Sequence, residues 1–432
     1  MTRHPGPDPL MDALFPGVPT AVDWGLGRMR AALAELGDPH LRYPTLHVGG
    51  TNGKGSVAST WASVLRLQGA RAGLYTSPHL CSFRERIMVD GEPVPAARLL
   101  DAAARLRPLA RELGMSFFEA STLLALVVFA ESDVDAASIE VGLGGRLDAT
   151  NVIEPEVTAI TNVALDHQDY LGHSLEEIAR EKAGIIKPGV PVVTAEGRPA
   201  VLKVLEGRAA RVGAPFHRIE PWRDIAELRL GRGGTRFSVR TAGGGLLDLR
   251  TPLPGAHQAA NAALAVRALE LLPEPPSPDA VRAGVAAVRW PGRGQVHRVG
   301  GLHYIFDVAH NRAAVGALAR ILADLAPPRP LVVLAGILGD KNWSRMLPPL
   351  VDLADRVVFT IPASAPPERN WDPRAVASEV GEGVSIDVVD EVGSAVEYAA
   401  GLAPGGTVVV TGSCHTVGDA LQILGVNPFD NG

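Results

Sequence analysis

The sequence predicts an α/β protein with two domains, the first larger than the second. Its 432 residues are too many for one ordinary domain and enough for two. Short apolar runs with strand character alternate with helical patterns along most of the chain, which indicates mainly parallel sheets. One stretch departs from this alternation, and its pattern predicts a small antiparallel sheet within the first domain. These three observations predict the fold class.

The first domain is expected to contain a mainly parallel sheet with helices between its strands. The residues between the strands have helical periodicity over three stretches, which are 55–68, 96–113 and 118–132. The expected strands are Thr45–Val48, Ala72–Thr76, Ala137–Val141, Val157–Thr161 and Val192–Thr194.

The pattern changes between about Phe216 and Gly255, where glycine-rich turns separate three alternating runs. This predicts an antiparallel meander, followed by a helix over His257–Leu272 and a proline-rich turn that no helix crosses. The meander strands are expected at Ala226–Leu230, Thr235–Thr241 and Leu246–Thr251.

A second α/β domain is expected to follow, and we place the boundary between residues 292 and 293. The domains are therefore predicted as 1–292 and 293–432, with an uncertainty of about ten residues in the boundary. The strands of the second domain are expected at Tyr304–Asp307, Leu331–Leu334, Arg356–Thr360, Ser385–Val389 and Thr407–Thr411.

Composition excludes several classes of protein. The formal net charge of −6 argues against an unspecific nucleic-acid binder, which would normally be basic. Two cysteines far apart exclude a disulfide framework. The longest apolar run, Leu123–Ala130, is far shorter than a membrane span, and Met1–Pro19 lacks the apolar core of a signal peptide. We expect a cytoplasmic protein with no membrane or nucleic-acid partner.

The strongest local signal is a glycine-rich loop, His47–Val57, between a short buried strand and a helix. Its glycines let successive backbone N–H groups converge on phosphate oxygens, and Lys54 adds a point charge. The alternative, an ordinary glycine-rich turn, does not explain why Lys54 and Ser56 stand where phosphate chemistry needs them. The expected nucleotide-binding residues of the loop are Gly50, Thr51, Asn52, Gly53, Lys54, Gly55 and Ser56.

The loop resembles that of the Mur ligase superfamily, and specifically of its folylpolyglutamate synthase / dihydrofolate synthase branch. The resemblance covers nearly the whole chain. The chain has no room before the loop for the additional domain of the Mur ligases that act on UDP-sugar peptides, which favours the folate branch. The matching segments are Gly50–Ser56, Thr76–Leu80, Phe83–Ile87, Glu140–Asn151, Thr161–His167, Glu181–Pro188, Gly255–Asn261, Pro291–Arg293, Asp307–Asn311 and Thr411–Ser413.

The resemblance implies a P-loop ATPase domain that also binds folate and a Rossmann-like glutamate ligase domain. It implies an ATP-dependent amide ligase that adds L-glutamate to dihydropteroate, and to tetrahydrofolates, through an acyl phosphate, giving ADP and phosphate. The implied partners are therefore ATP, L-glutamate and dihydropteroate or a reduced folate, and the implied state is a monomer. Two Mg²⁺ sites are implied as well, and magnesium prefers oxygen ligands.

The resemblance also assigns roles on the metal and nucleotide side. Ser77, Glu140 and His167 are implied metal ligands. Lys182 matches a lysine that is carbamylated by CO₂, which requires a neutral amine. The implied catalytic residues are Lys54, Glu140, His167, Lys182 and Arg293, and the further nucleotide contacts are His257, Asn261, Arg293 and Asp307.

The remaining implied residues serve the two substrates that are joined. Aromatic faces suit a flat pterin, and a carboxylate suits its amino groups. The folate-side candidates are Phe83, Arg86, Phe118, Asp148 and Ala149, and the glutamate-side candidates are Asp307, His310 and Ser413.

Two segments depart from the family pattern, both in the glutamate region of the second domain. In the segment 307–312 the family has glycine and proline where this chain has Val308 and Arg312, and Ser413-Cys-His-Thr lacks the expected aromatic or aliphatic residues. A different acid or amine partner on the same scaffold therefore stays open as an alternative. A nucleotide-binding module without catalysis is a third reading, against which the joint retention of Lys54, Glu140, His167 and Lys182 argues.

Overall fold

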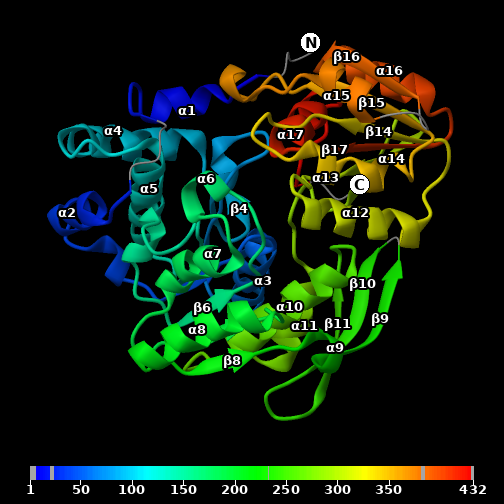
Figure 1. Cartoon of the computed structure of the whole chain (residues 1–432). Coiled ribbons are helices and arrows are strands. Elements are labelled where there is room, and N and C mark those ends of the chain that lie inside the picture. The colour runs from blue at the N-terminus through cyan, green and yellow to red at the C-terminus, as the bar shows by residue number, and fades with distance from the viewer. Residues whose placement is uncertain (1–5, 20–23, 232, 381–384, 430–432) are drawn as a thin grey trace.

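The computed structural model describes residues 6–19, 24–231, 233–380 and 385–429. Three sheets organise these residues, in the order of the chain: one of eight strands, one of three and one of six. The first two belong to the larger N-terminal part, and the third, yellow to red in Figure 1, lies beside them. The α/β class with mainly parallel sheets is thereby confirmed.

The eight-stranded sheet is parallel except at one edge, where β3 and β4 run antiparallel to their neighbours. β1 lies near the middle, between β5 and β6, so the loop that follows it emerges at the carboxyl edge of the sheet. In sheet order the strands are β4 (Glu92–Pro93), β3 (Ile87–Val89), β2 (Ala72–Tyr75), β5 (Ala136–Glu140), β1 (Thr45–Gly49), β6 (Val157–Ile160), β7 (Val192–Thr194) and β8 (Phe216–Arg218).

Helices and short 3₁₀ turns connect these strands. Three of the helices, α1, α2 and α4, lie with α5 at the left of Figure 1. Their bounds are α1 (Pro9–Leu14), α2 (Gly27–Glu35), η1 (Pro39–Leu41), α3 (Lys54–Leu67), η2 (Phe83–Arg86), α4 (Ala96–Glu112), α5 (Phe117–Glu131), η3 (Ala149–Val152), α6 (Gln168–Leu171), α7 (Leu175–Lys182), η4 (Ala183–Ile185), α8 (Pro199–Val212) and α9 (Pro221–Asp224).

The small sheet is an antiparallel meander in the order β11–β10–β9, as expected. One face is buried: the burial of β11 alternates strictly along the strand, with its buried side chains in the same core as α10. The elements are β9 (Ile225–Gly231), β10 (Gly234–Arg240), β11 (Leu246–Thr251), α10 (Ala256–Leu269) and α11 (Pro278–Ala286).

The third sheet has the order β12–β13–β17–β14–β15–β16 and is parallel except for the β12–β13 hairpin. Its central strands are buried along their whole length, as the continuous apolar runs predict. The elements are β12 (Gln295–Val299), β13 (Leu302–Phe306), α12 (Arg312–Leu325), β14 (Leu331–Ala335), α13 (Trp343–Met346), α14 (Pro348–Val351), β15 (Arg356–Ile361), η5 (Pro367–Arg369), α15 (Pro373–Val380), β16 (Ile386–Glu391), α16 (Val392–Leu402), β17 (Thr407–Thr411) and α17 (Cys414–Ile423).

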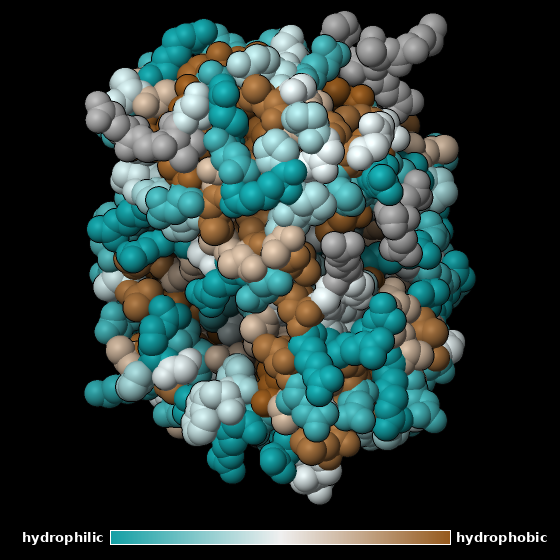
Figure 2. Space-filling view, turned by 90° about the vertical axis from the view of Figure 1, so that its right-hand side faces the viewer, coloured by the Kyte–Doolittle hydropathy of each residue, from teal (hydrophilic) through white to brown (hydrophobic). Residues whose placement is uncertain are grey.

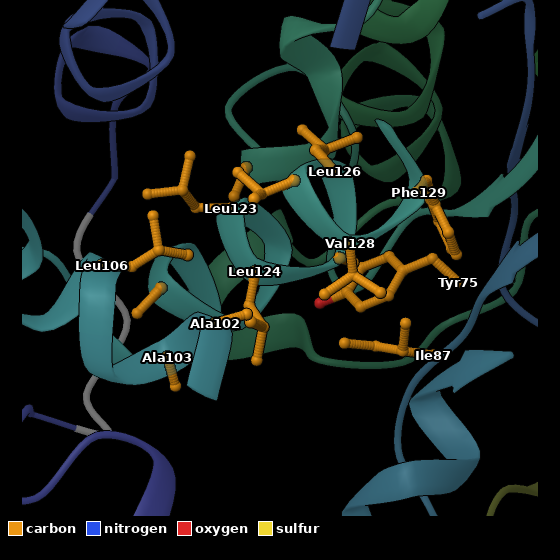
Figure 3. Close-up of a cluster of buried hydrophobic side chains, with 14 of the residues drawn as sticks. Tyr75, Ile87, Ala102, Ala103, Leu106, Leu123, Leu124, Leu126, Val128 and Phe129 are labelled. Atoms are coloured by element: carbon orange, nitrogen blue, oxygen red, sulfur yellow. The ribbon is translucent and has the colours of Figure 1, made fainter. Parts of the chain in front are cut away.

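A large apolar cluster fixes one face of the first sheet. Figure 3 shows side chains of α4 and α5 turned toward one another, with Tyr75 and Ile87 of the sheet beside Val128. Ser116 caps α5 at its N-terminus in a capping box with Glu119, and the helix is then buried on every side. This explains why the run Leu123–Ala130 is apolar throughout although it spans no membrane.

Two details differ from the sequence-based expectation. Phe216–Arg218, in the region where the pattern changes, forms a strand that was not predicted; it pairs in parallel with β7 at the edge of the large sheet, and the meander begins after it at Ile225. The third sheet starts earlier than expected, because Gln295–Val299 forms an antiparallel edge strand on β13. Both strands are short and lie at sheet edges, where the apolar pattern is weak.

Within the described residues, no helix is long and apolar enough to cross a membrane. Figure 2 turns the side with the third sheet toward the viewer, and hydrophilic residues are spread over it between smaller apolar areas.

Candidate active site

A cavity of about 470 Å³ lies at the carboxyl edge of the first sheet and is shared with the second α/β unit. Its walls come from loops that follow β1, β5, β6 and β13, together with the first turns of α10 and α12. Ligands of open α/β sheets bind at this edge, so the position is the one that the strand order predicts. The lining includes residues 50–56, 140–144, 307–310 and 313–314, with Ser77, His167, Lys182, His257, Asn261 and Arg293.

The phosphate loop forms one wall of this cavity. Lys54 is the first residue of α3, so the helix N-terminus points into the loop. The Lys54 amine donates to the carbonyl of Thr51 at 3.2 Å and lies 4.0 Å from the Glu140 carboxylate. The Ser56 hydroxyl is buried and has no hydrogen-bond partner among the described residues. The loop thus presents a cation and a free hydroxyl to the cavity.

Gly50 cannot carry a side chain in this loop. Its φ is 137°, and an added Cβ would lie 1.9 Å from the Thr161 hydroxyl oxygen. We expect Gly50→Ala to raise the KM for ATP by about tenfold or more, because the loop must shift away from the phosphates. Steady-state ADP release measures this. Gly207→Ala is the control, since no atom lies within 4 Å of a Cβ there; equal kinetics for the two variants would contradict the prediction.

Glu140 ends β5 and its carboxylate is almost fully buried against the loop after β2. The Ser77 N–H donates to Glu140 Oε2 at 3.3 Å. Burial raises the pKa of Glu140, and the nearby positive charge of Lys54 opposes that rise. The structure therefore brings Ser77, Glu140 and Lys54 together beside the cavity.

His167 follows β6 in the left-handed region, with φ at 50°, and lines the same cavity. Burial lowers its pKa to about 4, and the positive charges of Lys341 and Lys54 add to this against the Asp166 carboxylate. A neutral imidazole is the form that binds metals. Its neighbour Asp166 accepts from Lys341 and Asn311 of the second α/β unit.

Lys182 is the last residue of α7 and is almost fully buried. Its amine donates to the Gly50 carbonyl at 2.9 Å, so it lies directly under the phosphate loop. Burial lowers the pKa of Lys182 to about 7, and the nearby charge of Lys54 adds to the effect. A considerable fraction of this amine is therefore neutral near pH 7.

Arg293 and Asp307 form the wall on the side of the third sheet. Asp307 accepts from the backbone N–H groups of Gly294 and Ala309 at 2.8 and 2.9 Å. Burial raises the pKa of Asp307 to about 6, against the positive charge of Arg293. The guanidinium of Arg293 lies 5.7 Å from the ring centroid of Trp290. His310 also lines the cavity, and its Nδ1 lies 2.9 Å from the Val308 carbonyl.

Residues of α10 and α12 form another part of the cavity wall. His257 and Asn261 both line it from the first turns of α10, as their spacing predicts. Asn261 packs so closely on Gly53 that a Cβ there would lie 2.5 Å from its Oδ1. Ala314 and Ala317 of α12 are also part of this wall.

Six predicted substrate residues are not among those that line the cavity. Phe83 and Ala149 are buried in the cluster of Figure 3, and Ser413 is buried as the cap of α17. Asp148 uses its carboxylate to accept from Leu143 N and Thr150. Arg86 donates to His79 Nδ1 at 2.9 Å, and Phe118 packs on Gly142.

Several lining residues had no counterpart in the sequence-based prediction. Asp166 stands directly before His167, so the same motif could have indicated it. Lys341, which is not itself among the lining residues, donates to Asp166 from a loop 175 residues further along the chain, and no local signal predicts this contact. The further unpredicted lining residues include Asn162, Arg198, Gln258 and Arg320.

The metal question rests on the donors present. No group of three or more His, Cys, Asp or Glu that could hold a metal ion occurs in the part of the chain that the structure describes. The cavity does offer the Glu140 carboxylate, the His167 imidazole and the partnerless Ser56 hydroxyl. The carboxylate and the hydroxyl fit magnesium, which binds through one or two carboxylates together with substrate phosphates and water.

Comparison with known proteins gives matches over most of the chain. Residues 48–269 match the Mur ligase middle domain, and residues 292–414 match the glutamate ligase domain of Mur ligases. Folylpolyglutamate synthase of Lacticaseibacillus casei is 36% identical, covering 92% of this chain and 94% of that protein. Dihydrofolate synthase/folylpolyglutamate synthase of Mycobacterium tuberculosis is 35% identical, covering 97% of this chain and 93% of that protein.

Solved structures agree with these relatives. Mycobacterium tuberculosis folylpolyglutamate synthase complexed with ADP superposes with a TM-score of 0.88 at 35% identity, covering 97% of both chains. E. coli FolC in complex with DHPP and ADP has a TM-score of 0.83 at 32% identity, covering 96% of both chains.

Proposed function

Because the chain belongs to the Mur ligase family, in its folylpolyglutamate synthase / dihydrofolate synthase branch, we propose that it joins the amine of L-glutamate to the carboxylate of dihydropteroate and of reduced folates. It is an acid–amino-acid ligase that uses ATP. One observation carries the proposal: a phosphate loop, a buried carboxylate and an arginine from the second α/β unit line one cavity.

Different walls of the cavity are proposed to bind different parts of the substrates. The phosphate loop and Lys54 hold the triphosphate, while Arg293 approaches from the opposite side to neutralise the transferred phosphoryl group. The folate carboxylate takes the γ-phosphoryl group, and the acyl phosphate is then attacked by the glutamate amine, which releases phosphate. His310 and Asp307 lie where this amine is expected to arrive.

Magnesium is part of this proposal, with Ser77, Glu140 and His167 as the residues that would hold two ions. Bound there, the ions would neutralise charge on the phosphates. The lowered pKa of His167 favours a neutral imidazole, and the Ser77 N–H donates to the Glu140 carboxylate. The Lys182 carbamate belongs to the same proposal, supported by the buried, partly neutral amine.

The domain division 1–292 and 293–432 also belongs to the proposal. It is supported by α11, which ends at Ala286, and by the third sheet, which begins at Gln295. The monomeric state belongs to the proposal as well, and size-exclusion chromatography with light scattering tests it.

The test is to mix the purified chain with ATP, Mg²⁺, dihydropteroate and L-glutamate. We expect dihydrofolate and ADP in equal amounts, and elongation of a reduced folate in a parallel reaction. ADP release that requires neither acid substrate would overturn the assignment.

A second candidate function is amide ligation with a different amine or acid. It is favoured by Val308, which is buried where the family has glycine, and by Cys414, which lines the cavity in the altered segment after Ser413. A panel of amino acids in the ADP-release assay separates the candidates, because the glutamate ligase should prefer glutamate and the alternative should not.

A further inference from the structure

A polar network joins the phosphate loop to the second α/β unit, and its centre is Asp166. Lys341 Nζ lies 2.9 Å from Asp166 Oδ1, and both side chains are only 9% exposed. Asn311 Nδ2 donates to the other oxygen, Oδ2, at 3.2 Å. Asp166 belongs to the loop after β6, whereas Lys341 and Asn311 belong to the second α/β unit, which is built around the third sheet.

The network continues from Asn311 into the phosphate loop. Asn311 Nδ2 donates to Asn52 Oδ1 at 2.9 Å, and Asn52 Nδ2 lies 3.4 Å from Asn311 Oδ1. Asn52 is in turn held by Asn162, whose Oδ1 accepts from Asn52 N at 3.2 Å and whose Nδ2 donates to Asn52 O at 2.8 Å. An unbroken path of hydrogen bonds therefore leads from Lys341 to the loop that cradles the phosphates.

The network also fixes groups that face the cavity. Asn311 caps α12, because its Oδ1 accepts from Ala314 N at 3.0 Å. His310 Nε2 lies 3.8 Å from Asp166 Oδ2. The nearest other acid to Lys341 is Asp340, at 3.9 Å, which pairs with Arg369 at 2.9 Å. Asp166 is thus the principal partner of Lys341.

We propose that Asp166 and Lys341 are positioning residues. Their ion pair, extended by Asn311 and Asn52, holds the second α/β unit in a fixed position relative to the phosphate loop. The amine-binding side of the cavity is thereby assembled next to the place where the acyl phosphate forms. This inference rests on the proposed function for its kinetic consequence and on the geometry alone for its structural consequence.

The charges of this pair are compensated mainly by one another. Removing one member of a buried ion pair leaves the other without compensation, so each single replacement is more disruptive than the loss of the pair itself. A double replacement by uncharged residues should then be no worse than the poorer single variant. This non-additivity distinguishes coupled residues from two independent ones.

The kinetic test uses Lys341→Met, Asp166→Asn and the double variant. We expect each single variant to lower kcat/KM for the amino acid by about tenfold or more, and the double variant to lose no more than the poorer single one. Lys341→Arg, which retains the charge, should restore most of the activity. Lys203→Met, an exposed lysine on α8, is the matched control and should behave as the wild type. Multiplicative losses in the double variant, or single losses within twofold, would overturn the proposal.

The structural test needs no substrate and so remains informative if the proposed function fails. Amide hydrogen exchange of residues 50–53, measured without nucleotide, should accelerate in Lys341→Met and stay unchanged in Lys203→Met. A purely local role for Lys341 would not reach this loop, which lies in the other α/β unit. Unchanged exchange in Lys341→Met therefore overturns the coupling.

Discussion

Replacement of Lys54 by methionine is expected to lower kcat by about 100- to 1,000-fold. Lys54 lies at the first turn of α3, and its amine reaches both the Thr51 carbonyl and the Glu140 carboxylate. Methionine keeps most of the side-chain volume and removes the positive charge. The loss therefore reports the stabilisation that this charge supplies as the phosphoryl group is transferred.

The measurement is ADP release at saturating substrates, with the thermal unfolding temperature recorded for each variant. Lys203→Met makes the same chemical change on the exposed surface of α8 and should leave kcat unaltered. A kcat for Lys54→Met within a factor of two of the wild type would contradict a catalytic role for Lys54.

Replacement of Lys182 is expected to give the second large loss of activity. We propose that this lysine reacts with CO₂ before it takes part in catalysis. The neutral amine attacks the carbon of CO₂ and loses a proton, which leaves a carbamate anion in place of a cation. We expect Lys182→Met to lower kcat by about 100-fold through loss of that anion beside the proposed metal site. Wild-type activity should fall in CO₂-depleted buffer and return when bicarbonate is added.

The pH dependence of this effect follows from the depressed pKa of the Lys182 amine. Since that pKa is about 7, the amine is mostly protonated at pH 6 and mostly neutral at pH 8. Restoration by bicarbonate should therefore be slow at pH 6 and faster as the pH rises through 7. A carbamate carbon signal from ¹³C-labelled bicarbonate, present in the wild type and absent from Lys182→Met, checks the modification itself. Activity that is indifferent to CO₂ would argue for an unmodified lysine.

Much of the fold could be predicted because its strands are short apolar runs with clear boundaries. Thr407–Thr411 and Val192–Thr194 have the bounds that their sequences predict, β1 is longer by one residue at its end, and β5 is shifted by one residue. The edge strands β8 and β12 were not predicted, because an edge strand needs less apolar surface and its pairing partner can lie far away in the sequence.

The phosphate-side residues could also be predicted, because each follows a strand at the carboxyl edge of the sheet. Lys54, Glu140 and His167 therefore line one cavity, as the strand positions imply. Sequence does not specify which way a side chain turns after it leaves a strand or a turn. Phe83 turns into the core, while Asp166 meets Lys341 only because two separate sheets face one another.

The attachment of Arg293 has a consequence for the timing of the reaction. Its neighbour Gly294 is bound by Asp307, and β12 begins one residue later, so the guanidinium is carried by the third sheet rather than by the sheet that holds the phosphate loop. If that unit swings outward, the arginine departs with it and the triphosphate loses one of its counter-charges. Under the proposed role of Arg293, ATP in such an opened cleft would lack this counter-charge, and transfer of its phosphoryl group to water would be slower.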